Sequence, residues 1–201
     1  MFKPLILIGA GGHGKVVLDA AIKAGYSVVG FLDDYYERNI LGYRWLGKLS
    51  EFEKYVDKNI FIISIGDNIL RKKISKTIEA EWASIIHPSA IKGMNVIIGL
   101  GTVVMAGTVL NSCVRIGRHC IINTSAVIEH DCIISNYVHI SPGVVLCGGV
   151  NISDSTWIGA GAVIKNGISI CQNVIIGAGA VVVKDILQEG TYIGIPAKLI
   201  D

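Results

Sequence analysis

The sequence predicts two units of different class, an α/β unit over residues 1–87 and an all-β unit over residues 88–201. Up to His87, short aliphatic runs alternate with segments of helical spacing, a pattern typical of parallel βαβ units. After His87, aliphatic residues recur at every sixth position, a period that neither a helix nor an alternating strand produces. The change of period places the division at this point.

The first unit contains three expected strands and two expected helices. The aliphatic runs at residues 5–9, 28–33 and 59–66 (LILIG, VVGFLD and NIFIISIG) predict buried strands. Residues 14–25 have helical spacing and end in glycine, and residues 68–81 predict a charged amphipathic helix. Strands that alternate with helices indicate a Rossmann-like parallel sheet.

The second unit is predicted to be a hexapeptide solenoid. Fifteen consecutive aliphatic residues occupy every sixth position from Ile98 to Val182, and the position four residues further on is small or β-branched nearly throughout. Such a repeat is typical of a parallel β-helix in which each hexad supplies one short strand and one turn.

The composition argues against several classes of protein. The formal net charge is +2 without any Lys/Arg run, so charge gives no support for binding nucleic acid or a membrane surface. Hydrophobic residues make up 51% of the chain, but no uninterrupted run reaches the roughly 20 residues of a membrane span. The first apolar stretch is too short for a signal peptide, so we expect a cytoplasmic protein without membrane insertion. The five cysteines form no C-x-x-C pair, which favours reduced side chains over disulfides or a zinc site.

A glycine loop follows the first expected strand. Gly9, Gly11 and Gly14 have G-x-G-x-x-G spacing before a helix, which lets backbone amides approach phosphate. Asp33 and Asp34 follow about twenty residues later, as in NAD-binding loops. A solenoid offers no place for a hydride acceptor, which argues against NAD. A nucleotide other than NAD, or a tight turn without any ligand, remains open.

Two histidines and a carboxylate interrupt the aliphatic repeat. His130 and Asp131 follow Ile128 near a turn, where side chains point outward, and His139 follows nine residues later. An outward His–Asp pair suits a general base, because imidazole has a suitable pKa and the carboxylate raises its basicity. A structural histidine at an interface is the alternative.

These segments resemble a known family. The chain resembles the bacterial nucleotide-aminosugar N-acetyltransferases and the related sialic acid O-acetyltransferases. The resemblance rests on the hexads, on the segment NTSAVIEHDC, on the loop GAGGHG and on the run FLDD. In these left-handed parallel β-helix proteins, three hexads make one triangular coil. The resemblance extends over nearly the whole chain to GIPAKLI. It is most specific around His130 and least specific in the glycine loop.

The resemblance implies acetyl-CoA as the co-substrate and assigns catalytic roles. His130 is expected to accept the proton, Asp131 to tune it, and His139 to contact acetyl-CoA. With 18 residues per coil, about five coils in all, Gly148 stacks one coil above His130, and its amide N–H is expected to stabilise the oxyanion. Ala160 and Ala178 share one column, along which we expect acetyl-CoA to lie.

The resemblance also implies the acceptor and its site. The positions that bind a nucleotide-linked sugar match six residues in the first unit: Gly11, Gly12, His13, Asp33, Asp34 and Gly66. We expect a UDP-linked 4-amino-4,6-dideoxy sugar, the choice of UDP resting on the resemblance alone. A GDP-linked 4-amino sugar, free sialic acid as an O-acetyl acceptor, and a non-enzymatic nucleotide-binding assembly factor are the alternatives.

Two expectations concern the assembly and metals. His130 and His139 are half a coil apart, so one site that uses both has to be built between two protomers. The resemblance favours a homotrimer. No metal is expected, because the H-x4-H pair of carbonic anhydrases with the same prism fold is missing.

Overall fold

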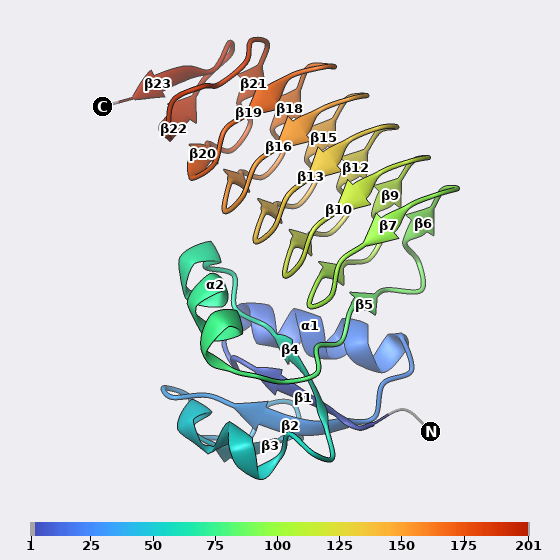
Figure 1. Ribbon diagram of the computed structural model, residues 1–201, viewed down its shortest axis with the longest axis vertical. Coiled ribbons are helices and arrows are strands. Elements are labelled where there is room, and N and C mark those ends of the chain that lie inside the picture. The colour runs from blue at the N-terminus through green and yellow to red at the C-terminus, as the bar shows by residue number, and fades with distance from the viewer. Residues whose placement is uncertain (1–2, 201) are drawn as a thin grey trace.

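The computed structural model describes residues 3–200 and places an α/β domain beside the first coils of a long prism (Figure 1). In the α/β domain the order of elements is β1 (Leu5–Ile8), α1 (Gly12–Lys23), β2 (Val28–Leu32), β3 (Arg44–Gly47), the 3-10 helix η1 (Leu49–Lys54), β4 (Ile60–Ile63) and α2 (Asn68–Thr77). The four strands are all parallel in the order β3-β2-β1-β4. The predicted parallel sheet is confirmed.

The α/β domain differs from the prediction at two places. The strand β3 and the helix η1 were not predicted. The sequence of β3, RWLG, has no aliphatic run like those of β1 and β4, and the burial of its side chains is incomplete. Helix α2 ends four residues before the expected end, since Ile78 adopts an extended conformation and the following segment returns to β4. There Phe61 forms a parallel bridge with Trp82.

The prism has three faces of parallel two- or three-residue strands. Face A contains β5 (Ile85–Ile86), β8 (Val103–Val104), β11 (Ile121–Ile122), β14 (His139–Ile140), β17 (Trp157–Ile158) and β20 (Val174–Ile176). Face B contains β6 (Ile91–Lys92), β9 (Val109–Leu110), β12 (Val127–Ile128), β15 (Val145–Leu146), β18 (Val163–Ile164) and β21 (Val181–Val182). Face C contains β7 (Ile97–Ile98), β10 (Arg115–Ile116), β13 (Ile133–Ile134), β16 (Asn151–Ile152) and β19 (Ser169–Ile170). Two further strands, β22 (Gly190–Ile193) and β23 (Lys198–Ile200), extend face A at the C-terminal end as an antiparallel pair.

The pairing of strands confirms the coil of 18 residues. Ile121 pairs with His139, and His139 pairs with Trp157, on successive coils of face A. The solenoid also begins earlier than the aliphatic repeat indicated, at β5 and β6. Lys92 occupies the inward position of β6 on the exposed first coil. Because this position is not aliphatic, the hexad of β6 was not recognised as part of the repeat.

The aliphatic repeat forms the core of the prism. Every repeat residue from Val104 to Val182 is at most 3% exposed, and the small residues between them, such as Ala126 and Cys132, are also buried. Burying one such aliphatic side chain contributes about 1.5–3 kcal/mol. The division at residue 87 remains a prediction. Strand β5, just before it, already pairs with β8 of the prism and contributes Ile85 to the core beneath α1.

The three corners of the prism differ in what they carry. The chain passes from face A to face B, then to face C and back to face A. Corner AB contains residues such as Pro142 and Ala160, and corner BC contains His130. Helix α2 lies against corner CA, where Asn68 donates a hydrogen bond to the Ser155 carbonyl. Among the residues that the structure describes, no helix has both the length and the apolar character to cross a membrane.

Candidate functional site

A pocket of about 500 Å³ lies at the carboxyl ends of the strands in the α/β domain. Parallel sheets commonly bind ligands at this edge. The pocket is bounded by the loops after β1, β2 and β4 and by one face of α2. It brings together all six residues predicted to bind the nucleotide-linked sugar, which are Gly11, Gly12, His13, Asp33, Asp34 and Gly66.

The glycines of the first loop are required by close packing. A Cβ atom on Gly14 would lie 2.4 Å from the Gly9 carbonyl oxygen, and one on Gly9 would lie 2.5 Å from Ile65 Cγ1. Gly9 also has φ +107°, a conformation that favours glycine. Helix α1 begins directly at the pocket, and no side chain caps its first amide groups. Such uncapped amides and the positive end of the helix dipole favour an anion.

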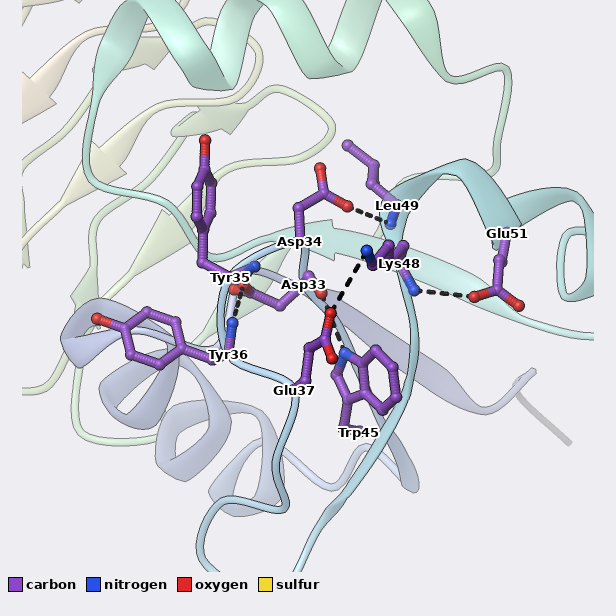
Figure 2. Close-up of polar contacts among 9 residues, drawn as sticks. All are labelled: Asp33, Asp34, Tyr35, Tyr36, Glu37, Trp45, Lys48, Leu49 and Glu51. Carbon is purple, nitrogen blue, oxygen red and sulfur yellow. Dashed lines mark hydrogen bonds and ion pairs between the residues drawn. The ribbon is translucent and has the colours of Figure 1, made fainter.

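Asp33 shapes the pocket through the backbone. Its Oδ2 accepts a hydrogen bond from the Ala10 amide at 2.6 Å, and its Oδ1 accepts from the amides of Tyr35 and Tyr36 at 2.7 and 2.8 Å. Figure 2 shows the last two bonds, together with the bond from the Leu49 amide to Asp34 Oδ1 at 2.8 Å. The buried Asp33 carboxylate therefore joins the glycine loop to the loop after β2.

A second cavity of about 440 Å³ forms a groove at corner AB of the prism. It brings together His139, Ala160 and Ala178, the three residues predicted to contact acetyl-CoA. Gly159 and Gly177, each one residue before an alanine of this column, also line the groove. A long ligand could therefore lie close to the backbone of successive coils.

The polar residues that surround His139 in the groove were not predicted from the sequence. The Nδ2 atom of Asn123 lies 3.2 Å from His139 Nε2, and the Trp157 ring stacks on His139 at 5.5 Å between ring centroids. The Trp157 Nε1–H donates to Ser141 Oγ at 2.8 Å. All four residues line the groove. Their common signal is the 18-residue spacing, which places Asn123 and Ser141 on adjacent coils.

His13 of the pocket and His139 of the groove lie close together, with ring centroids 6.2 Å apart. Burial, followed by the positive charge of Arg71, lowers the pKa of His13 from 6.5 to about 4 and that of His139 to about 3. Both imidazoles are therefore neutral near pH 7. The two rings lie between the two cavities.

The predicted His–Asp pair is present at corner BC. His130 Nδ1 lies 2.8 Å from Asp131 Oδ2, and the two side chains are 64% and 65% exposed. Asp131 has φ +60°, a left-handed turn conformation that aspartate tolerates. The bond at Nδ1 leaves the Nε2 atom of His130 free to act at this exposed corner.

Gly148 lies directly against the His130 ring, as the coil spacing predicted. A Cβ atom at position 148 would be 2.6 Å from both Cε1 and Nε2 of His130. The Gly148 carbonyl accepts from Gly167 and the His130 carbonyl accepts from Gly149, whereas the Gly148 amide donates to no backbone carbonyl among residues 3–200.

The structure does not bring His130 to the two cavities of its own chain. His130 lines neither the pocket nor the groove, because it lies at corner BC, whereas the groove is at corner AB. Among residues 3–200, no three or more His, Cys, Asp or Glu residues are arranged to hold a metal ion.

Two segments of the chain match two protein families. The PglD N-terminal domain matches residues 4–78, and the bacterial transferase hexapeptide family (six repeats) matches residues 149–184. UDP-N-acetylbacillosamine N-acetyltransferase of Bacillus subtilis is 36% identical over 112 residues, which are 52% of each chain. The match therefore spans about half the length of that relative. GDP-perosamine N-acetyltransferase of Escherichia coli O157:H7 is 31% identical over 162 residues, 75% of this chain and 73% of the relative.

Two solved structures have the same architecture over the full length. The acetyltransferase domain of PglB from Neisseria gonorrhoeae, in complex with acetyl coenzyme A, has a TM-score of 0.95 and 35% identity and covers 100% of both chains. PerB from Caulobacter crescentus, in complex with CoA and GDP-perosamine, has a TM-score of 0.93 and 34% identity and covers 100% of this chain and 99% of PerB. The chain therefore belongs to the family of nucleotide-aminosugar N-acetyltransferases, which join a PglD N-terminal domain to a hexapeptide-repeat β-helix.

Proposed function

We propose that the chain transfers the acetyl group of acetyl-CoA to the amino group of a UDP-linked 4-amino-4,6-dideoxy sugar. The observation that carries this proposal is the exposed His130–Asp131 pair, whose 2.8 Å contact orients an imidazole for proton transfer at the prism surface. The groove with His139, Ala160 and Ala178 is the proposed acetyl-CoA site, and the pocket at the glycine loop is the proposed nucleotide site.

The proposed reaction needs no covalent enzyme intermediate. The neutral sugar amine attacks the thioester carbonyl carbon, and a bond between nitrogen and carbon forms while Nε2 of His130 takes the amine proton. Asp131, at Nδ1, stabilises the imidazolium that results. The Gly148 amide N–H donates to the oxyanion of the tetrahedral intermediate. Collapse of the intermediate breaks the bond between carbon and sulfur, and CoA leaves with the proton.

We propose a homotrimer in which each active site lies between two protomers. His130 and the groove occupy different corners of one prism, so a site that uses both needs His130 from a neighbouring copy. Face B also presents an apolar surface for such a contact. Its outward positions form one column of aliphatic residues in register, consisting of Ile91, Val109, Val127, Val145, Val163 and Val181. A continuous aliphatic column beside the catalytic pair is typical of a surface covered by another subunit.

Mixed assemblies test this arrangement. Chains with His130→Ala and chains with His139→Ala, unfolded and reassembled together, are expected to regain part of the native activity, because some clefts then combine two intact histidines. Light scattering should give three times the mass of one chain. A fully active monomer, or mixtures no more active than the parent variants, would contradict the shared site.

The choice of UDP is supported by the relative that is named for a UDP sugar, which is 36% identical over 112 residues, whereas the relative named for a GDP sugar is 31% identical over 162 residues. The decisive experiment measures kcat/KM for UDP- and GDP-linked 4-amino sugars side by side, with release of the CoA thiol as the signal. A higher kcat/KM for the GDP sugar would replace the nucleotide and leave the chemistry in place. Acetylation of free sialic acid instead would replace N-acetyl transfer by O-acetyl transfer, and no thiol release with any acceptor would favour a binding protein.

A further inference from the structure

Arg71 of helix α2 is fully buried between the α/β domain and the prism, and all of its N–H groups have partners. The side chain has no exposed surface. Its Nε donates to the His119 carbonyl at 2.7 Å, and its Nη2 donates to the Tyr137 carbonyl at 3.0 Å and to Asn68 Oδ1 at 2.6 Å. Its Nη1 donates to the carbonyls of Ile65 and Gly66 at 3.0 and 3.1 Å.

These bonds connect the walls of the two cavities. Ile65 and Gly66 line the pocket. Tyr137 is two residues before His139, which lines the groove. One planar guanidinium therefore fixes the loop of the nucleotide pocket to the turn that leads into the groove. A planar group with five donors in a rigid fork defines the relative position of its acceptors better than a flexible ammonium group does.

Helix α2 matches the spacing of the coils at this contact. Asn68 donates to the carbonyls of Ser155 and Thr156 at 3.1 and 3.2 Å, one coil beyond Tyr137. Residues three apart on a helix differ by about 4.5 Å along its axis. The strands of adjacent coils are about 4.8 Å apart. Asn68 and Arg71 thus contact successive coils, which sets the height of the α/β domain along the prism.

The contact is not an ion pair. Among the described residues Arg71 has no carboxylate within ion-pair distance, and its hydrogen-bond acceptors are neutral. Burial lowers the pKa of Arg71 to about 10, so the side chain remains charged near pH 7. A buried charge held by neutral acceptors costs free energy that a hydrophobic side chain would not. Stability alone therefore does not account for an arginine at this position.

We propose that Arg71 is a positioning residue, which holds the nucleotide pocket at the distance and orientation that present the bound substrate to the acetyl-CoA groove. This inference rests on the proposed function and adds the device that sets the geometry between the two substrates. Reactions between two bound molecules are sensitive to this geometry, and a displacement of about 1 Å can lower the rate about 10²-fold.

The test compares Arg71→Lys and Arg71→Met with the native full chain. Calorimetry measures the binding of UDP, GDP and CoA separately, and steady-state kinetics with both substrates saturating measure kcat. We expect Arg71→Met to lower kcat about 10²-fold while the Kd values for the nucleotides and for CoA change less than about threefold. Arg71→Lys, which keeps the charge but loses the fork, is expected to recover about tenfold of that loss.

Lys72→Met is the matched control. Lys72 also contacts the prism, with its Nζ 3.2 Å from Ser155 Oγ and 5.5 Å from the Tyr137 ring centroid, but it does not reach the pocket loop. Its kcat should stay within about threefold of the native value, as expected for a partly exposed contact away from both cavities.

Three outcomes would overturn the proposal. The first is a native kcat in a folded Arg71→Lys variant. The second is weaker binding of the nucleotide or of CoA to Arg71→Met that accounts for its whole loss of activity. The third is a loss of kcat in Lys72→Met as large as that in Arg71→Met. If Arg71→Met does not fold, the Arg71→Lys result decides. A native enzyme without acetyl transfer to any nucleotide-linked amino sugar would refute the proposed function itself, and this inference with it.

Discussion

Gly148→Ala is expected to lower kcat about 10²-fold without destabilising the fold. The three atoms nearest to a Cβ at this position all belong to the His130 ring, two of them at 2.6 Å. Since carbon atoms in contact are about 3.5 Å apart, the ring has to move by about 0.9 Å. That movement disturbs its 2.8 Å bond to Asp131. A displacement of this size accounts for about 10²-fold in rate, or about 2.7 kcal/mol of transition-state stabilisation.

The fold should tolerate the change, because the His130 side chain is 64% exposed and can move into solvent. Alanine also keeps the amide N–H of position 148, so the variant separates the placement of the ring from the proposed oxyanion contact. The assay is thiol release at saturating substrates, with melting temperature as the measure of folding.

A double-mutant cycle provides the control for this prediction. In a His130→Ala background the added methyl group no longer meets the imidazole, so Gly148→Ala should have little further effect on the residual rate. An unchanged kcat in the single variant would refute the reasoning. The same 10²-fold loss in the His130→Ala background would show that Gly148 acts independently of the histidine.

Three further measurements test other parts of the site. His130→Ala should lower kcat about 10²–10⁴-fold, and Asp131→Asn should lower it less, whereas full activity of the first variant would make the pair structural. Ala178→Leu should raise the acetyl-CoA KM, because a larger side chain fills the groove, and an unchanged KM would place the cofactor elsewhere. Burial lowers the pKa of His119 and of His13 to about 4 and that of His139 to about 3. These bases bind fewer protons in the folded state, so the free energy of unfolding should fall as the pH drops from 6.5 to about 4, and the contribution of His139 should continue to fall to about pH 3. A His119→Phe variant should show a shallower fall, measured as melting temperature against pH, and an identical slope would refute this assignment.

The prism could be predicted from the sequence because its core depends on one repeated choice of side chain. Inward positions need aliphatic residues and the adjacent corners need small ones, so the same pattern of residues recurs in every coil and predicts the same structure each time. The first coil does not follow this pattern of inward aliphatic residues. Its β6 strand has Lys92 at the inward position, and an exposed end coil does not require an apolar residue there.

The sites could be predicted only in part. The column of Ala160 and Ala178 and the stacking of Gly148 on His130 follow directly from the 18-residue period. Arg71 could not be found in the same way, because it lies in a segment with Lys72 and Lys73 that has the composition of an exposed helix face. Its burial depends on how α2 packs against the prism, and this tertiary contact cannot be predicted from the local sequence.

Asp33, unlike Arg71, was identified from the sequence, but its role could not be predicted. Its distance from the glycine loop indicated a contact with a nucleotide, and it does line the pocket. Its two carboxylate oxygens, however, accept three backbone N–H groups. A motif identifies such a residue without distinguishing a ligand contact from the support of the loop.

The pairing of residues 18 apart also restricts how this lineage can change in length. An insertion or deletion that is not a multiple of six would shift every later inward side chain to a corner or to the surface, and one of six or twelve would move each later strand to another face. A whole coil added between Tyr137 and Ser155 would separate the carbonyls that α2 spans by about one strand spacing, 4.8 Å. A coil added beyond Ala178 would leave those contacts and the stacking of Gly148 on His130 unchanged. Descendants of this chain should therefore gain coils at the C-terminal end of the prism, in whole multiples of 18 residues.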